Sequence, residues 1–145
     1  MKNLSLFLLS ALLASACSPE DMALEKLQGR WQAQSLSHPD SVWQQRFDTC
    51  GIELEFFPCA QPYTATCSLQ IREQGQGGYL SIDTLKYTIK GDELAFVDGA
   101  SKPKLLYFSN LIQLRRFRWS LPSDSQLEWV RIDTTVVEFR FQRME

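Results

Sequence analysis

The sequence has 145 residues, of which 44% are hydrophobic and 22% are charged. This length fits one domain, and the composition is that of a folded globular protein rather than of a disordered or fibrous chain. The 15 Lys and Arg against 17 Asp and Glu give a formal net charge of −2, without the excess of basic residues that nucleic-acid-binding proteins usually carry. We therefore expect no nucleic-acid partner.

Residues 1–16 have the composition of an export signal. Lys2 is their only charged residue, and the apolar stretch 4–16 is shorter than the roughly 20 residues that a membrane-spanning helix needs. The tripeptide Ala14-Ser15-Ala16 is a small-residue cleavage site, and Cys17 follows it directly. The sequence therefore predicts a signal peptide over 1–16 that is removed before Cys17.

The segment Leu13-Ala14-Ser15-Ala16-Cys17 resembles the lipobox of bacterial lipoproteins, in which the cysteine thiol receives a diacylglyceryl group and the freed amine is then acylated. The resemblance implies a cell-envelope protein that is anchored to a membrane through acyl chains on Cys17. Ser18 follows the cysteine, and a residue other than aspartate there implies the outer membrane, at its periplasmic face or at the cell surface. The alternative is an ordinary secreted protein in which Cys17 pairs with another cysteine.

A short helix is predicted within 17–29. Ser18 can cap its first turn, Pro19 suits the first helical position, and Gly29 can end it. A helix of two or three turns is stable only when it packs on the main fold, so we expect a lid or plug. Its apolar side consists of Met22, Leu24 and Leu27.

From Trp31 onward the hydrophobic period changes to two, which indicates strands with one buried face. Clusters of Gly, Pro and Asp mark turns between them. The sequence therefore predicts an all-β fold over 30–145, a small antiparallel barrel of eight or nine strands, which is favoured over a sandwich because closure removes exposed strand edges. The predicted strands are 31–37, 51–57, 63–72, 79–90, 93–98, 104–109, 112–120, 126–132 and 135–142.

The segment Leu27-Gln28-Gly29-Arg30-Trp31 follows the predicted helix and opens the first strand. It resembles the Leu-x-Gly-x-Trp motif of lipocalins and lipocalin-like bacterial lipoproteins, and a Tyr-x-Ile-x-Gly-Asp-x-Leu segment and a final Glu-Phe-Arg-Phe strand agree with this. The resemblance implies a lipocalin-like barrel in which Gly29 permits the passage from helix to strand. It also implies that Trp31 closes the barrel base beneath an arginine, Arg140 or Arg143. A Thr-Asp-Tyr-like loop, the second lipocalin signature, is not evident.

If Cys17 is acylated, three cysteines remain, and one internal disulfide can form in an oxidising compartment. Cys59 and Cys67 flank a proline-containing turn and are the first choice, which leaves Cys50 as a buried thiol. The alternative pairs Cys50 with Cys67 across neighbouring strands. No metal site is expected, because the sequence has no Cys-x-x-Cys and its single histidine is remote from the cysteines.

The sequence contains a few residues of the types used in catalysis, but their positions are explained more simply by the predicted fold. His38 falls in a predicted loop, while Glu53 and Glu55 alternate with apolar residues and belong to the solvent-facing side of a strand. No phosphate-binding loop, zinc motif or nucleophile elbow is present in the sequence. We therefore expect neither enzymatic activity nor a cofactor, and only a carboxylate pair or Cys50 beside His38 in a cleft would favour a hydrolase.

Our leading hypothesis for the function is an envelope lipoprotein, acting as a monomer, whose barrel binds or sequesters a small apolar or amphipathic ligand. Binding of this kind requires inward-facing aromatic residues along the barrel wall. The candidates for that wall are Tyr63, Tyr87, Phe117, Trp119 and Phe139.

The alternative is an interaction module whose interior is filled by its own side chains and which binds an envelope protein or a glycan through an outer patch. The basic and aromatic segment 115–119 is the candidate patch, with Arg115, Arg116 and Arg118 beside Phe117 and Trp119. Apolar positions change phase within this region, which predicts a β-bulge near Arg115 and Arg116.

Overall fold

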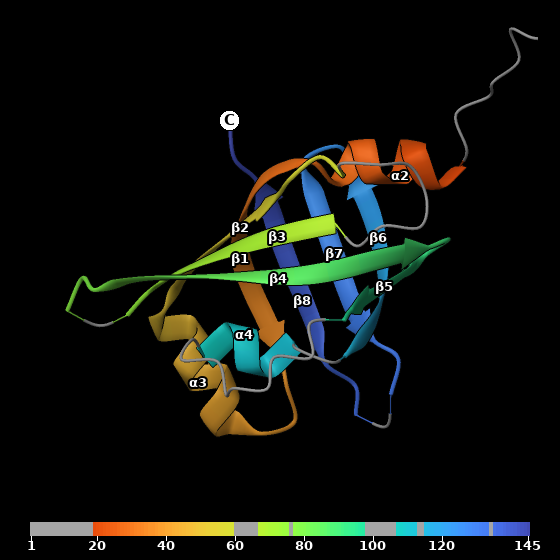
Figure 1. The fold of residues 1–145 in the computed structure, drawn as a ribbon. Helices are drawn as coiled ribbons and strands as arrows, with labels where there is room; N and C mark the ends of the chain where they lie inside the picture. Colours follow the sequence, from red (N-terminus) through yellow and green to blue (C-terminus); the bar gives the residue numbers. More distant parts are fainter. Residues whose placement is uncertain (1–18, 60–66, 76, 98–106, 113–114, 134) are drawn as a thin grey trace, which may run out of the picture.

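Eight antiparallel strands close into one barrel in the order β1 to β8 in the computed structural model of the chain. Figure 1 shows how these strands and the helices are arranged. The structure describes residues 19–59, 67–75, 77–97, 107–112, 115–133 and 135–145. The strands are β1 (Gly29–Ser37), β2 (Gly51–Phe56), β3 (Cys67–Gln74), β4 (Leu80–Lys90), β5 (Glu93–Phe96), β6 (Arg116–Ser123), β7 (Gln126–Arg131) and β8 (Glu138–Arg143). The helices are α2 (Pro19–Leu27), α3 (Ser41–Thr49) and α4 (Tyr107–Ile112).

The predicted all-β barrel with a short helix before its first strand is confirmed. Each strand pairs with the next one in the sequence, and β1 closes the barrel by pairing with β8 as well as with β2. Trp31 of β1, for example, stands opposite Leu54 on one side and Arg143 on the other. The period of two follows from this arrangement, because one face of every strand lines the interior.

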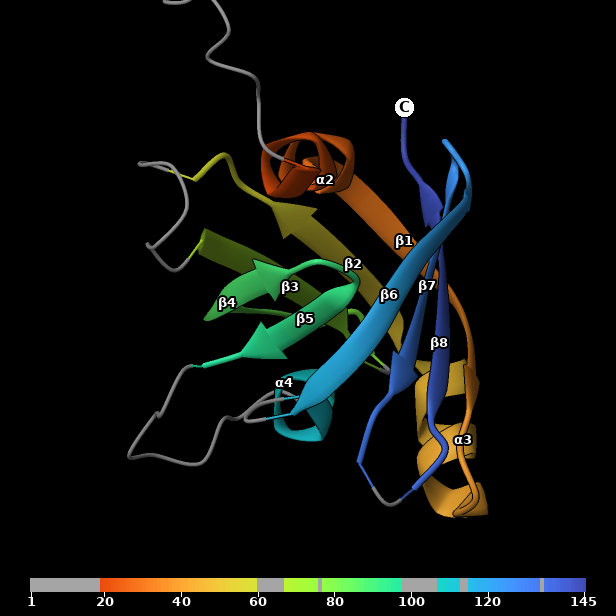
Figure 2. The ribbon, with the colours of Figure 1, turned by 90° about the vertical axis from the view of Figure 1, so that its right-hand side faces the viewer.

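Helices lie at both ends of the barrel. In Figures 1 and 2, α2 lies at one end, whereas α3 and α4 lie at the opposite end. Leu27 of α2 is buried, as are Phe47 of α3 and Phe108 of α4, so each helix adds an apolar side chain to the core. Met22, predicted on the apolar side of α2, is instead exposed. Among the described residues, no helix is long and apolar enough to cross a membrane.

The structure corrects the sequence prediction between β5 and β6. The predicted strand 104–109 is wrong over its described residues, because Tyr107–Ile112 forms α4. Among the described residues, Ile112 belongs to the helix, and β6 begins at Arg116 and pairs regularly with β5, so the predicted bulge near Arg115 and Arg116 is not seen there. The register irregularity of β6 falls instead between Ser120 and Ser123. The carboxylate of Glu73, buried in β3, accepts the Phe108 N–H at 3.0 Å and so satisfies a backbone donor in the first turn of α4.

The predicted disulfide is confirmed. Cys59, after the end of β2, is bonded to Cys67, the first residue of β3, with their Cα atoms 4.8 Å apart. The bridge therefore joins the residues that follow β2 covalently to the first residue of β3. Cys50 is a free thiol that is half-buried rather than fully buried.

Replacing both bridged cysteines by serine is expected to lower the free energy of unfolding by about 2 kcal/mol, because the unfolded chain regains the freedom of a short loop. Urea unfolding of the oxidised wild type and of the Cys59→Ser/Cys67→Ser variant measures this difference. Cys50→Ser is the control, since it removes a thiol without opening a loop. An unchanged unfolding midpoint in the double variant would contradict a stabilising role for the bridge.

Candidate functional site

A clamp built on Arg143 holds α2 against the barrel. The Cζ atom of Arg143 lies 4.2 Å from the centre of the Trp31 ring, which is a cation–π contact. The same guanidinium donates to the carbonyl oxygens of Gln28 (2.9 Å) and Lys26 (2.5 Å), and its Nε donates to the carbonyl of Asp124 (2.9 Å). Arg143 thus satisfies carbonyl groups at the C-terminal end of α2, where a helix leaves them without internal partners.

Trp31 and Gly29 complete the clamp in the way that the lipocalin resemblance implies. The Trp31 indole N–H donates to the Leu27 carbonyl at 2.9 Å. Gly29 has a φ of +109°, and a Cβ built on it would lie 3.3 Å from Nη1 of Arg143. Both the backbone conformation and the close guanidinium therefore favour glycine at this position. Of the two candidate arginines it is Arg143 that covers Trp31, since Arg140 pairs with Glu128 at the surface.

The five predicted wall residues are not all brought together. Tyr87, Phe117 and Phe139 are fully buried, and the rings of Phe117 and Phe139 lie 5.8 Å apart. Trp119 is only half-buried, and its indole N–H donates to the Gly91 carbonyl at 3.2 Å. Tyr63 lies outside the described residues. Of the four predicted wall residues that the structure describes, three therefore lie in the interior.

Trp129 of β7 also lies in the interior, although it is not among the five residues predicted to line the barrel wall. It is fully buried, and the alternation of apolar residues in the predicted strand 126–132 contained the signal that it faces inward. Aromatic rings surround it at centroid distances of 4.6–6.2 Å, which are ordinary packing distances. These neighbours are Phe56, Phe96, Phe117, Phe139 and Phe141.

Two aromatic side chains in this interior carry a polar atom without a hydrogen-bond partner among the described residues, the Tyr87 hydroxyl and the Trp129 indole nitrogen, and the buried Ser109 hydroxyl of α4 is a third such atom. Both rings meet Phe56 edge to face, Tyr87 at 5.3 Å and Trp129 at 6.0 Å between centroids. A buried donor without an acceptor costs about 1–3 kcal/mol. Burial also raises the pKa of Tyr87, so its hydroxyl keeps its proton at neutral pH.

The described interior has little charge to offer a ligand. Its buried polar side chains are Glu73 and Ser109, and no lysine, arginine or histidine among the described residues is buried. Glu73 already accepts the Phe108 N–H. The polar groups available to a bound molecule in this part of the barrel are therefore mainly the unpartnered Tyr87 hydroxyl, Trp129 indole N–H and Ser109 hydroxyl.

The basic patch predicted at 115–119 is divided between the two faces of the barrel wall and balanced by acidic residues. Phe117 points into the core, whereas the three arginines are exposed. A hydrogen bond from Arg116 lowers the pKa of Glu93. The ion pairs are Arg115 with Asp133 (3.6 Å), Arg116 with Glu93 (2.6 Å) and Arg118 with Asp92 (3.1 Å).

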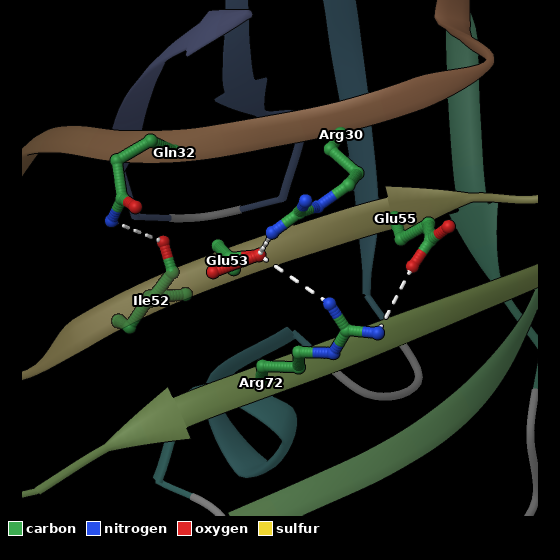
Figure 3. A network of polar contacts seen from close by, with 6 residues as sticks. All are labelled: Arg30, Gln32, Ile52, Glu53, Glu55 and Arg72. Atoms are coloured by element: carbon green, nitrogen blue, oxygen red, sulfur yellow. Dashed lines mark hydrogen bonds and ion pairs between the residues drawn. The ribbon is translucent and has the colours of Figure 1, made fainter. Parts of the chain in front are cut away.

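Glu53 and Glu55 form part of an ion-pair network on the outer face of β1–β3 (Figure 3). Arg72 contacts Glu53 at 3.5 Å and Glu55 at 3.3 Å, and Arg30 pairs with Glu53. Each carboxylate is thus opposite a guanidinium. Partly exposed pairs of this kind contribute little to stability, and this arrangement gives no sign of paired carboxylates poised for acid–base chemistry.

The contacts of His38 belong to the local fold before α3, and the surroundings of Cys50 disfavour its ionised form. Nδ1 of His38 accepts the Asp40 N–H at 2.9 Å, and Asp40 caps α3 by accepting the Val42 N–H. Burial, and then the neighbouring carboxylate of Glu73, raise the pKa of the Cys50 thiol, which disfavours the nucleophilic thiolate. Within the described part of the chain, no group of three or more His, Cys, Asp or Glu residues could hold a metal ion.

Comparisons with known proteins agree with the barrel. No protein-family model and no curated protein matches the sequence. The structure is similar to that of a redesigned β-barrel, with a TM-score of 0.53, 20% identity, and coverage of 85% of this chain and 96% of that chain. A second similar structure is a de novo designed fluorescence-activating β-barrel, with a TM-score of 0.42, 13% identity, and coverage of 84% and 97%. At 20% identity the first similarity shows the fold alone.

Proposed function

We propose that this protein is a lipid-anchored protein of the cell envelope whose lipocalin-like barrel binds a small, mainly apolar molecule without transforming it. The observation that carries the proposal is the pair of unpartnered donors, Tyr87 and Trp129, set among aromatic rings inside a closed barrel. Small-molecule sites combine apolar walls with a few polar groups of this kind. The aromatic packing around Trp129 argues for a ligand that is small or that displaces a ring.

One further observation supports the lipocalin-like part of this proposal, and another describes how close to the proposed anchor the barrel would lie. The contacts of Gly29, Trp31 and Arg143 match those that the lipocalin resemblance implies for the base of the barrel. Cys17, the proposed site of acylation, lies outside the described residues, but α2 begins at Pro19, two positions later. Acyl chains on Cys17 would therefore hold the barrel close to the membrane surface, at the outer membrane if Ser18 acts as the resemblance implies.

The test uses the full chain expressed in a Gram-negative host and extracted from membranes with a mild detergent. Native mass spectrometry is expected to show a chain that begins at Cys17 with acyl groups and carries a small molecule that denaturation releases. Cys17→Ser should lose the acyl mass and the membrane association while keeping the ligand. An unmodified chain would overturn the anchor. A chain without ligand that also fails to bind apolar fluorescent probes would overturn the carrier function.

A second candidate function is an interaction module with a filled core. The contacts between interior rings favour it, as does an exposed apolar hairpin between β3 and β4, which projects from the barrel in Figure 1. Tyr79 is 81% exposed there, Leu80 59% and Ile82 55%. Such exposed apolar side chains are typical of binding surfaces. If the barrel is filled, the chain should carry no small molecule in the mass-spectrometry experiment above and should bind no apolar fluorescent probe.

A further inference from the structure

The chemical class of the proposed ligand can be read from the two unpartnered donors, and this inference rests on the proposed function. We infer that the barrel recognises a neutral molecule through a hydrogen-bond acceptor oxygen, such as the carbonyl of a ketone, aldehyde or ester, and discriminates against carboxylates. The rings of Tyr87 and Trp129 both pack edge to face on Phe56, and the acceptor would lie within hydrogen-bond distance of the Tyr87 hydroxyl or of the Trp129 indole N–H.

The need for an acceptor follows from the donor inventory of these two side chains. An indole N–H can only donate, and a phenol keeps its hydroxyl proton available as a donor. Tyr87 comes from β4 and Trp129 from β7, so the two donors approach from different parts of the barrel wall. A carbonyl oxygen has two lone pairs and can accept from one donor or from both. An alkyl chain alone would leave both unsatisfied.

The preference for a neutral acceptor follows from the charges around it. Burying a carboxylate without a counter-ion is costly, and the buried polar side chains among the described residues are Glu73, itself an acid, and Ser109. Arg143, the arginine of the α2 clamp, already donates to three backbone carbonyls and lies over the Trp31 ring. A cationic ligand would in turn leave both donors without an acceptor. The raised pKa of Tyr87 agrees with a donor that persists across neutral pH.

The experiment compares two fluorescent probes that share one ring system. The first is the solvatochromic ketone prodan, a propionyl-dimethylaminonaphthalene, and the second is the corresponding dimethylaminonaphthoic acid. With the wild-type chain at neutral pH, we expect the ketone to bind about tenfold more tightly than the ionised acid, or better still. Lowering the pH until the acid is protonated should narrow the difference, because the penalty for burying its charge disappears.

Variants locate the contact. Tyr87→Phe removes the hydroxyl alone and is expected to weaken ketone binding about threefold to tenfold. It should also shift the emission of the bound probe to the blue, as expected when the carbonyl loses a donor. Tyr79→Phe is the matched control, since Tyr79 is exposed on the β3–β4 hairpin. Trp129→Phe should act in the same direction, with Trp119→Phe as its control because that indole already donates to Gly91.

Folding is checked first by near-ultraviolet circular dichroism and thermal unfolding. Tyr87→Phe deletes an unsatisfied group, so its unfolding midpoint should equal or exceed that of the wild type. Equal binding of ketone and acid would overturn the inference and leave the proposed carrier function standing. If neither Tyr87→Phe nor Trp129→Phe changes the affinity for the ketone, the probe binds away from these two donors. That result would also overturn the inference and leave the carrier function standing. Failure of both probes to bind the wild type would overturn the inference, and it would overturn the carrier function as well if mass spectrometry also finds the chain without a ligand.

Discussion

Replacing Phe139 by alanine is expected to lower the free energy of unfolding by about 3–5 kcal/mol, a large fraction of the stability of a domain of this size. Phe139 lies in β8 and is fully buried. Its ring lies 5.4–6.2 Å from five other aromatic rings, which come from α3 and α4 at one end of the barrel and from three strands. They are Phe47, Phe108, Phe117, Trp129 and Phe141.

Urea unfolding followed by tryptophan fluorescence measures the loss. Val136→Ala is a suitable control, because Val136 is 68% exposed and its truncation should change the free energy of unfolding by no more than about 0.5 kcal/mol. Phe139→Leu keeps an apolar side chain at the site and should fall between the alanine variant and the wild type. A Phe139→Ala protein as stable as the Val136→Ala protein would show that these rings do not form one cooperative core.

Arg143→Ala is expected to cost about 2–3 kcal/mol, since it removes hydrogen bonds from a charged donor to three carbonyls and the contact with Trp31. Arg143→Lys should recover less than half of this loss, because a lysine ammonium cannot reproduce the planar fork of a guanidinium. Thermal unfolding gives the change in stability. Hydrogen exchange over α2 should rise in the alanine variant, because the carbonyls at the C-terminal end of this helix lose their donor.

The control for Arg143 is Arg140→Ala in the same strand. Arg140 is exposed and pairs at the surface with Glu128 at 3.2 Å, so its loss should change stability by about 0–1 kcal/mol. Equal effects of the two alanine variants would contradict a special role for the α2 clamp. A large loss at Arg143 with unchanged exchange in α2 would instead assign its contribution to the Trp31 and Asp124 contacts.

The strands could be predicted from the sequence because a barrel wall imposes a period of two, and the alternation is regular over all six residues of β2 and over the first five of β8. The two helices after β1 and β5 could not be predicted so easily. In α4, Tyr107, Phe108, Ser109 and Ile112 are buried, so its six residues show no polar face and no helical period. Tertiary contacts, including the one from Glu73, decide its conformation.

The candidate site was predictable in part for the same reason. Alternation identifies Tyr87, Phe117 and Phe139 as inward-facing, and it applies equally to Trp129. It does not show which polar atoms lack partners, because that depends on which strands face one another across the barrel. The neutralisation of the basic patch by acidic residues likewise depends on which segments lie next to each other in the folded barrel. The acidic partners of its arginines come from the β4–β5 turn, from β5 and from the segment after β7, and the sequence does not show this proximity.

The closure of the barrel by β1 and β8 has a consequence for the kinetics of folding. Gln28 and Arg143, which the clamp joins, are 115 positions apart, and the β1–β8 ladder joins segments almost as distant. Contacts between such distant segments form slowly, because the chain must lose the entropy of a long loop before they are made. Until then the nascent sheet has two unpaired edges, which can associate with other chains. We therefore expect refolding on a timescale of milliseconds to seconds and aggregation that increases with protein concentration.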